Sequence, residues 1–201
     1  MPSTMINYGP AEFSFAPREK VHPGFFSHYK KFWRGVKWQL FLLPAPTLEQ
    51  SLEQAKVHRV NEGIFPVPAV YEFAISKTRT GDRYKTYVGT TKNAKNRHGS
   101  YLNDGDHIAR FLEAAVRNGF FVHRRIRYII PKPELTPAQI ERAAVVAEQI
   151  ETRFLGKFNY AFNARQNGNE AMTRIPVKKP FLCMFSRVKW LKNPDAKKFY
   201  V

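Results

Sequence analysis

Residues 87–101 read YVGTTKNAKNRHGSY, and the fold can be predicted outward from this stretch. Residues 84–90 predict a strand, and 93–102 predict a helix that is stopped by the turn residues 103–105. Tyr101 lies one helical turn beyond Arg97, so these two side chains can share one face of the helix. The stretch therefore predicts a strand followed directly by a helix that carries a cation and a phenol.

The sequence before this stretch predicts a β-hairpin. Residues 69–76 form a short apolar run bounded by turn residues, which is typical of a strand. The polar loop 78–82 is short, so we expect the strand before it to pair with the strand over 84–90.

The sequence after this stretch predicts a helix and a third strand. Asp106 is placed to cap a helix over 106–118, and Gly119 is placed to stop it. Residues 120–130 have mainly apolar side chains at even positions and basic side chains at several odd positions. This alternation favours a strand with one apolar face and one basic face.

The best-defined helix is predicted over 136–157. Thr136 is the expected N-cap, Pro137 occupies the first helical position, and Gln139 completes a capping box. Its apolar stripe is formed by Ile140, Ala143, Ala147, Ile150, Phe154 and Phe158.

Three parts of the chain differ in composition. In residues 1–62 the sequence predicts an N-terminal extension with an irregular arm and helices. One of these helices is expected to begin after Thr47. The aromatic side chains of residues 25–43 are better explained as part of a core than as groups that stack on bases. Residues 63–165 predict the main domain, and 166–201 a basic C-terminal extension.

The charge balance makes a polyanion the expected partner. The chain has 33 Lys and Arg against 16 Asp and Glu, a formal net charge of +17, and the excess is present in all three parts. Such a surface favours nucleic acid over an anionic membrane, because Lys and Arg displace counterions from a phosphate backbone. No run approaches the roughly 20 apolar residues of a membrane span and no leader is evident, so we expect an intracellular, cytoplasmic protein with no membrane partner.

Cysteine and histidine usage excludes several kinds of site. Cys183 is the only cysteine, so an intramolecular disulfide or a Cys-rich zinc site cannot form. The histidines never occur at one-turn spacing, which argues against a histidine-based zinc site.

The order of motifs resembles that of the GIY-YIG nuclease family. Tyr87, Gly89, Arg97 and Tyr101 match the second half of that family's signature, and 69–71 (Ala-Val-Tyr) matches its Gly-Ile-Tyr. Glu151 and Asn163 match its helix glutamate and the asparagine that follows, twelve residues apart. Ala69 and Thr90 depart from the family, which commonly has glycine and lysine there. The resemblance covers about 69–165 and implies an α/β (α+β) fold, in which helices flank a small, mostly antiparallel three-stranded sheet.

The resemblance also implies a catalytic set. Glu151 would bind Mg²⁺ (or Mn²⁺), Arg97 would contact the scissile phosphate, and Tyr71 or Tyr87 would position or deprotonate the attacking water. An ordinary tyrosine titrates near ~10, so nearby cations or the metal would have to favour its phenolate. Tyr101 would share the face of Arg97, and Asn163 would hold the site together. Two alternatives stay open for the carboxylate: Glu148 as the ligand instead, or an ion pair of Glu151 with Arg142 or Arg153.

The resemblance implies a magnesium-dependent DNA endonuclease that leaves a 5′ phosphate and a 3′ hydroxyl, and we expect no small-molecule cofactor, with a homodimer possible. The alternatives are a catalytically inactive nucleic-acid-binding protein of the same fold and a basic structural protein bound to RNA. Sequence alone does not distinguish a role in restriction, homing, repair or phage DNA degradation. The residues expected to contact nucleic acid are His98, Lys92, Lys95, Arg125, Arg127, Lys178 and Lys179.

Overall fold

The computed structural model describes residues 16–17, 23–160, 162–163, 174–177 and 189–192. The predicted contacts of Lys178 and Lys179 lie outside these residues. The elements in chain order are β1 (Ala16–Pro17), α1 (Pro23–Phe32), β2 (Gln39–Leu42), α2 (Leu48–Val57), β3 (Ala69–Ser76), β4 (Tyr84–Thr91), α3 (Ala94–Asp104), the 3₁₀ turn η1 (Asp106–Ile108), α4 (Ala109–Arg117), β5 (Phe121–Tyr128), α5 (Pro137–Lys157), β6 (Phe158–Asn159), β7 (Arg174–Val177) and β8 (Lys189–Lys192).

The main sheet has four strands in the order β2-β5-β3-β4, and every pairing in it is antiparallel. The predicted hairpin of β3 and β4 is present, and Tyr71 of β3 lies opposite Gly89 of β4. The three-strand count was wrong, because β2 pairs with β5. The four residues of β2 come from the aromatic segment 25–43, in which helical and strand periodicity cannot be separated over so short a run. The boundary predicted near residue 63 stays a prediction.

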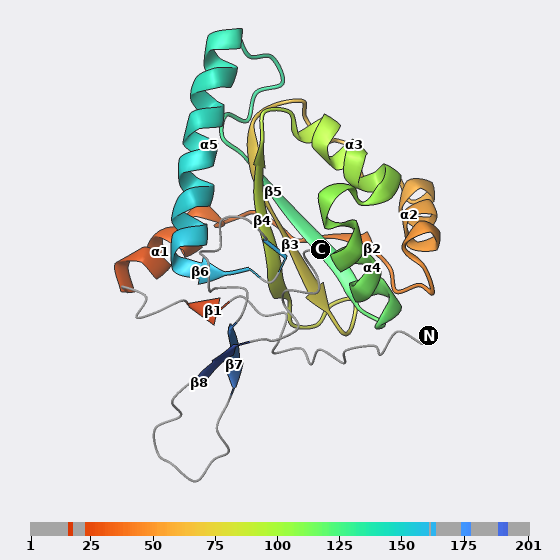
Figure 1. Cartoon of the computed structure of the whole chain (residues 1–201). Coiled ribbons are helices and arrows are strands. Elements are labelled where there is room, and N and C mark those ends of the chain that lie inside the picture. The colour runs from red at the N-terminus through yellow and green to blue at the C-terminus, as the bar shows by residue number, and fades with distance from the viewer. Residues whose placement is uncertain (1–15, 18–22, 161, 164–173, 178–188, 193–201) are drawn as a thin grey trace.

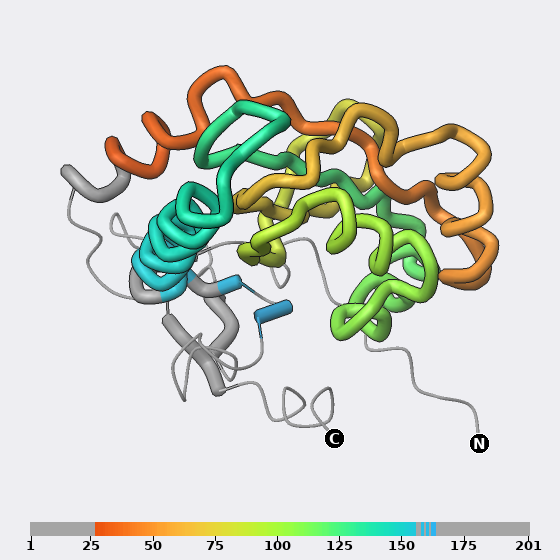
Figure 2. The backbone as a smooth tube through the Cα atoms, turned by 90° about the horizontal axis from the view of Figure 1, so that it is seen from above, coloured from red at the N-terminus to blue at the C-terminus, as the bar shows by residue number. Residues whose placement is uncertain are grey.

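Helices cover both faces of this sheet, as Figures 1 and 2 show. Helices α2, α3 and α4 lie on one face, and their apolar side chains form a core with Phe41, Phe73 and Val122 of the sheet. Helices α1 and α5 lie on the other face, where Val70 and Val88 contribute to a second core. Strand β4 is at the edge of the sheet and contacts both layers.

Helix ends follow the predicted caps in most places. The capping box of Thr136 and Gln139 is present at the start of α5, and the Thr47 side chain accepts a hydrogen bond from the Gln50 N–H at the start of α2. The segment 106–118 differs from the prediction of one helix, because it begins as the 3₁₀ turn η1 before α4. The turn η1 carries Asp106 and His107.

A buried ion pair between Glu72 and Arg125 of the sheet also binds Tyr29 of α1. The fully buried carboxylate of Glu72 in β3 accepts hydrogen bonds from Arg125 Nε at 2.8 Å and from the hydroxyls of Tyr29 at 2.8 Å and Tyr160 at 2.7 Å. The Arg125 guanidinium lies 4.0 Å from the centre of the Trp33 ring and 4.5 Å from that of Trp38. The predicted basic face of β5 is therefore buried and paired at Arg125 instead of open to solvent.

Gly89 allows the closest packing in the hairpin. A Cβ atom at this position would lie 2.7 Å from Cζ and from the hydroxyl oxygen of Tyr71, and 2.7 Å from Cε1 of Tyr87. Real Cβ atoms do not approach other heavy atoms so closely, so a side chain at 89 would displace both rings. The position of the two phenols thus depends on glycine in β4.

Removing the Glu72 carboxylate tests the importance of the buried pair. Glu72→Ala leaves the Arg125 charge buried without its partner, so we expect the free energy of unfolding to fall by about 3–5 kcal/mol. Glu53→Ala breaks the exposed Glu53–Lys56 pair and should change it by at most about 1 kcal/mol. Urea denaturation measures both variants, and equal small losses would contradict the anchoring role.

Two glycine substitutions test the packing at β4. Gly89→Ala should destabilise the protein by about 1–3 kcal/mol, because the added methyl group overpacks the phenol rings. Gly99→Ala is the matched control: it lies within α3 with no atom near its Cβ position, and we expect it to stabilise by up to about 1 kcal/mol. Thermal unfolding compares them, and a harmless Gly89→Ala would show that the rings do not depend on this glycine.

Candidate active site

Three phenols meet on the face of the sheet that α3 covers. Tyr71 and Tyr87 project from neighbouring strands with ring centres 6.0 Å apart, and the hydroxyl of Tyr71 lies 2.9 Å from that of Tyr101 in α3. All three side chains are buried. The structure thus brings together three of the predicted catalytic residues, although they are separated in sequence by up to 30 positions.

Burial keeps these phenols protonated. It raises the pKa of Tyr71 and of Tyr87 above the ordinary value, and the charge of Arg97, which lowers both, has a smaller effect than burial. Burial also raises the pKa of Tyr101. The expectation that cations of the protein would favour a phenolate is therefore not met, and a phenol that takes a proton from water needs a neighbour that accepts its own.

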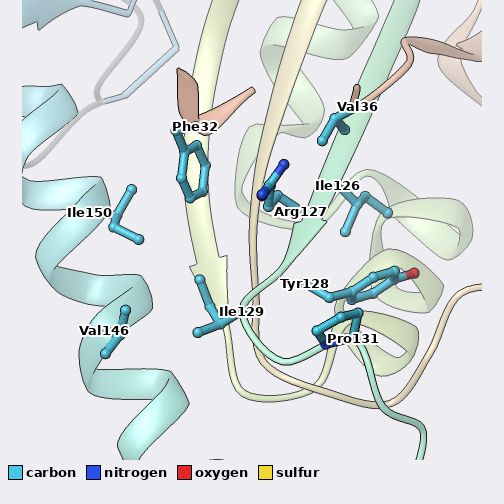
Figure 3. A pocket seen from close by; sticks show the side chains of 9 residues that line it. All are labelled: Phe32, Val36, Ile126, Arg127, Tyr128, Ile129, Pro131, Val146 and Ile150. Carbon is cyan, nitrogen blue, oxygen red and sulfur yellow. The ribbon is translucent and has the colours of Figure 1, made fainter. Parts of the chain in front are cut away.

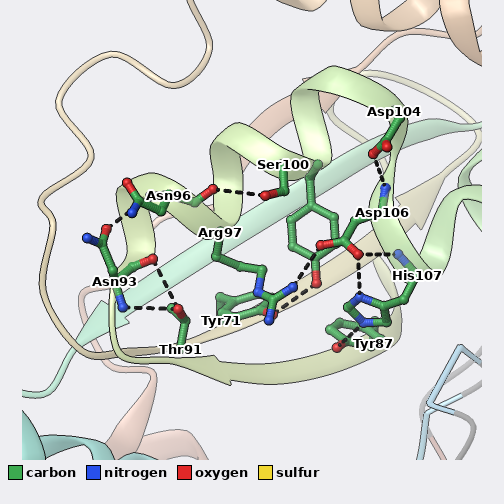
Figure 4. A network of polar contacts seen from close by, with 11 residues as sticks. Tyr71, Tyr87, Thr91, Asn93, Asn96, Arg97, Ser100, Asp104, Asp106 and His107 are labelled. Atoms are coloured by element: carbon green, nitrogen blue, oxygen red, sulfur yellow. Dashed lines mark hydrogen bonds and ion pairs between the residues drawn. The ribbon is translucent and has the colours of Figure 1, made fainter.

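Such a neighbour is His107, which the sequence analysis did not identify. Its Nε2 lies 2.8 Å from the hydroxyl of Tyr87, and its Nδ1 lies 3.3 Å from Oδ1 of Asp106 (Figure 4). The other oxygen of Asp106 accepts a hydrogen bond from Arg97 Nη1 at 2.7 Å. A continuous polar chain therefore runs from Tyr87 through His107 and Asp106 to Arg97.

The local fold explains how this chain forms. Helix α3 ends at Gly105, which has φ +83°, and Asp106 also has a positive φ, +51°. These two residues turn the chain so that His107 of η1 reaches the hydroxyl of Tyr87 in β4. In the sequence Asp106 indicated only a helix cap, and a lone histidine after it gave no spacing signal.

Glu151 approaches β4 from the opposite face, because it projects from α5. Its Oε2 accepts a hydrogen bond from the hydroxyl of Thr90 at 2.9 Å, and its charge acts on Tyr87 electrostatically. Burial raises the pKa of Glu151, which the Thr90 hydrogen bond lowers and Glu148 raises further. Phenols and carboxylate thus flank the same short stretch of one edge strand.

The alternatives for this carboxylate can be compared with the structure. Within the described residues, no ion pair joins Glu151 to Arg142 or Arg153. Glu148 is exposed, whereas Glu151 is partly buried against Thr90. A partly desolvated carboxylate with one oxygen already oriented is the better of the two ligands for a cation.

Asn163 closes the free edge of β4. Its Oδ1 accepts a hydrogen bond from the Val88 N–H at 2.9 Å, and its Nδ2 donates to the Val88 carbonyl at 2.7 Å. The N–H of Phe162 donates to the Thr86 carbonyl at 2.7 Å. The side chain of Asn163 therefore acts as a neighbouring strand would, at the residue between Tyr87 and Gly89.

The residues expected to contact nucleic acid are placed unequally. Lys95 is exposed in the first turn of α3, and Lys92 is exposed but pairs with Glu141 at 2.8 Å. Arg127 is partly exposed and donates to the Arg34 carbonyl at 3.1 Å. Lys95 and Arg127 are the best placed of these for a phosphate.

His98 and Arg125, two of the residues expected to contact nucleic acid, are buried. Arg125 is held by Glu72 as described above. His98 lies beneath Tyr71 with ring centres 5.0 Å apart, and neither of its ring nitrogens has a hydrogen-bond partner among the described residues. Burial, with the charges of Arg124 and Arg97, lowers the pKa of His98 well below its usual range, so the ring is neutral.

A separate pocket of about 440 Å³ lies between α1, the end of β5 and α5 (Figure 3). Its lining is mainly apolar and includes Phe32, Val36, Ile129 and Val146. It contains neither the phenols nor Glu151, so it is not part of the candidate active site.

The donor set fits only some metals. Within the described part of the chain, no group of three or more His, Cys, Asp or Glu side chains could hold an ion. A single carboxylate suits Mg²⁺, which keeps several of its waters, and does not suit zinc.

Within the described part of the chain, no helix is long and apolar enough to cross a membrane.

Comparison with known proteins identifies the family. No curated protein and no solved structure matches this chain significantly. A family model described as "GIY-YIG domain-containing protein" matches residues 26–175, most of the chain, including β2 and all the residues of the site. The match begins at residue 26, well before residue 63, where the main domain was predicted to start. The chain therefore belongs to the GIY-YIG domain family, and this membership indicates a nuclease-type function.

Proposed function

We propose that this protein is a divalent-metal-dependent DNA endonuclease that hydrolyses one phosphodiester at the edge of β4. The observation that carries the proposal is the arrangement around residues 87–90. Tyr87 and Tyr71 of the neighbouring strand lie on one face of the sheet, with Arg97 near them, and Glu151 lies against Thr90 on the other face. Such groups suit phosphodiester hydrolysis, because the reaction requires a proton acceptor for water and positive charge at the phosphate.

Glu151 is the residue that would hold Mg²⁺ or Mn²⁺. Thr90 occupies Oε2, which leaves Oε1 for the cation. When bound, the ion supplies charge stabilisation for a phosphate oxygen and for the leaving 3′ oxygen. Arg97 uses Nη1 to bind Asp106, and its guanidinium has further N–H groups with which to donate hydrogen bonds to the phosphate.

The hydrogen bonds support Tyr87 over Tyr71 as the group that accepts the proton of the attacking water. As the water oxygen attacks phosphorus, its proton passes to the Tyr87 oxygen and the Tyr87 proton passes to His107 Nε2. The bond to the 3′ oxygen breaks, and this oxygen takes a proton from solvent, which leaves a 5′ phosphate and a 3′ hydroxyl. Tyr71 is hydrogen-bonded to Tyr101 and would orient the site.

A plasmid nicking assay tests the activity. With supercoiled DNA and Mg²⁺, we expect the wild type to nick, and Glu151→Ala and Arg97→Ala to lower the rate by about 10²–10³-fold, since each removes charge stabilisation of the transition state. Glu148→Ala is the matched control, because it removes an exposed carboxylate one turn away on α5. It should retain most of the activity.

The variants also separate the competing hypotheses. Equal nicking by the wild type, Glu151→Ala and Arg97→Ala would reject the proposal. Salt-sensitive DNA binding without cleavage under any divalent ion would instead support a catalytically inactive binding protein. The same reaction run on single-stranded DNA and on RNA tests the choice of substrate.

Stability without metal gives a second test of the Glu151 environment. Burial raises the pKa of this carboxyl in the folded protein, so its ionisation destabilises the fold as the pH rises through that pKa, and the full cost is present above it. We expect Glu151→Gln to increase the free energy of unfolding at neutral pH in EDTA. The gain should disappear at a pH below the ordinary pKa of glutamate, where the wild-type side chain is protonated in both states.

Urea denaturation at several pH values measures this difference. A Glu151→Gln variant that is less stable than the wild type at neutral pH would show that the carboxylate is well solvated or paired. Glu148→Gln provides the comparison, because that side chain is exposed and should show no such gain.

A further inference from the structure

Asp106 occupies a left-handed turn at the start of η1. Its φ is +51°, a conformation that is uncommon outside glycine but that aspartate tolerates better than most residues, and its N–H donates to Asp104 Oδ1 at 2.7 Å. Gly105 before it has φ +83°, and a Cβ there would lie 2.9 Å from Cα of Ala109. Close packing thus requires glycine at 105, and left-handed non-glycine residues such as Asp106 are found at functional sites.

The two carboxylate oxygens of Asp106 have separate partners. Oδ1 accepts from the main-chain N–H of His107 at 2.6 Å and lies 3.3 Å from His107 Nδ1. Oδ2 accepts from Arg97 Nη1 at 2.7 Å. Burial raises the pKa of Asp106, but the hydrogen bonds from the main chain and side chain of His107 and from Arg97 together lower it below the ordinary value. The carboxylate is therefore ionised at neutral pH.

We propose that Asp106 is a positioning residue that holds His107 and Arg97 in one arrangement for the reaction. This inference rests on the proposed nuclease function. A carboxylate at Nδ1 keeps the imidazole proton on that nitrogen, so Nε2 has a lone pair to accept the proton of Tyr87. The same carboxylate fixes the guanidinium of Arg97 from one side and leaves its other N–H groups to face a phosphate.

Asp106 supports the reaction but should weaken the binding of DNA. Its negative charge is bound to the cation that would contact the phosphate, so it weakens the attraction of Arg97 for DNA. Removing this charge should then lower the turnover rate and tighten the binding of DNA. A residue that only supports the local fold would lower both activity and affinity when replaced.

Asp106→Asn provides the test. Asparagine tolerates the left-handed conformation and keeps an oxygen acceptor, so the turn should survive. With linear duplex DNA and Mg²⁺, we expect kcat to fall by about 10²-fold, within the range for loss of general acid–base assistance. Without metal, in EDTA, we expect the Kd for the same duplex to decrease about two- to fivefold, because one partly exposed negative charge that repels DNA has been removed.

Asp104→Asn is the matched control. It removes one negative charge from the same turn, and its oxygen can still accept from the Asp106 N–H, but it touches neither His107 nor Arg97. Its kcat should stay close to that of the wild type. Equal kcat for Asp104→Asn and Asp106→Asn, or a loss of both kcat and affinity in Asp106→Asn, would overturn the inference. A wild type that does not cleave would instead refute the proposed function, which Glu151→Ala tests in the same assay.

Discussion

The two hydrogen bonds between the Asn163 amide and the main chain of Val88 hold the strand on which the site depends. An edge strand has unpaired N–H and carbonyl groups on one side, and these would otherwise meet water or another chain. Asn163 satisfies them at the residue between Tyr87 and Gly89. These hydrogen bonds hold the strand in place at Val88. They therefore help to fix the positions of Tyr87 and Thr90, which project from opposite faces of β4.

The site combines groups that are costly for the protein to hold. Three phenols are buried together, and the Glu151 carboxylate is partly desolvated and, among the described residues, accepts a hydrogen bond from a threonine hydroxyl. The fold offsets these costs elsewhere, through the apolar cores on the two faces of the sheet. Helices on both faces of the sheet thus support this polar edge.

Much of the fold could be predicted from the sequence, because periodicity, caps and turn residues act locally. The hairpin of β3 and β4 and the capping box of α5 followed from such signals. Strand β2 did not, since four residues within an aromatic segment give no distinct period and their pairing with β5 is a tertiary choice. In the site, the resemblance to the family's motif indicated Tyr87, Arg97 and Glu151. It could not indicate His107, whose contact with Tyr87 depends on the left-handed turn at 105–106.

The central claim is that Glu151 and the phenols act on a single phosphodiester across β4. Anomalous scattering from Mn²⁺, in crystals of the protein with a duplex that carries a non-hydrolysable phosphate analogue, tests it most directly. The account predicts an ion bonded to a Glu151 oxygen, with Arg97 donating to the same phosphate and the Tyr87 hydroxyl facing its phosphorus. A bound phosphate remote from β4, or an ion held by Glu148 with Glu151 unliganded, would contradict it.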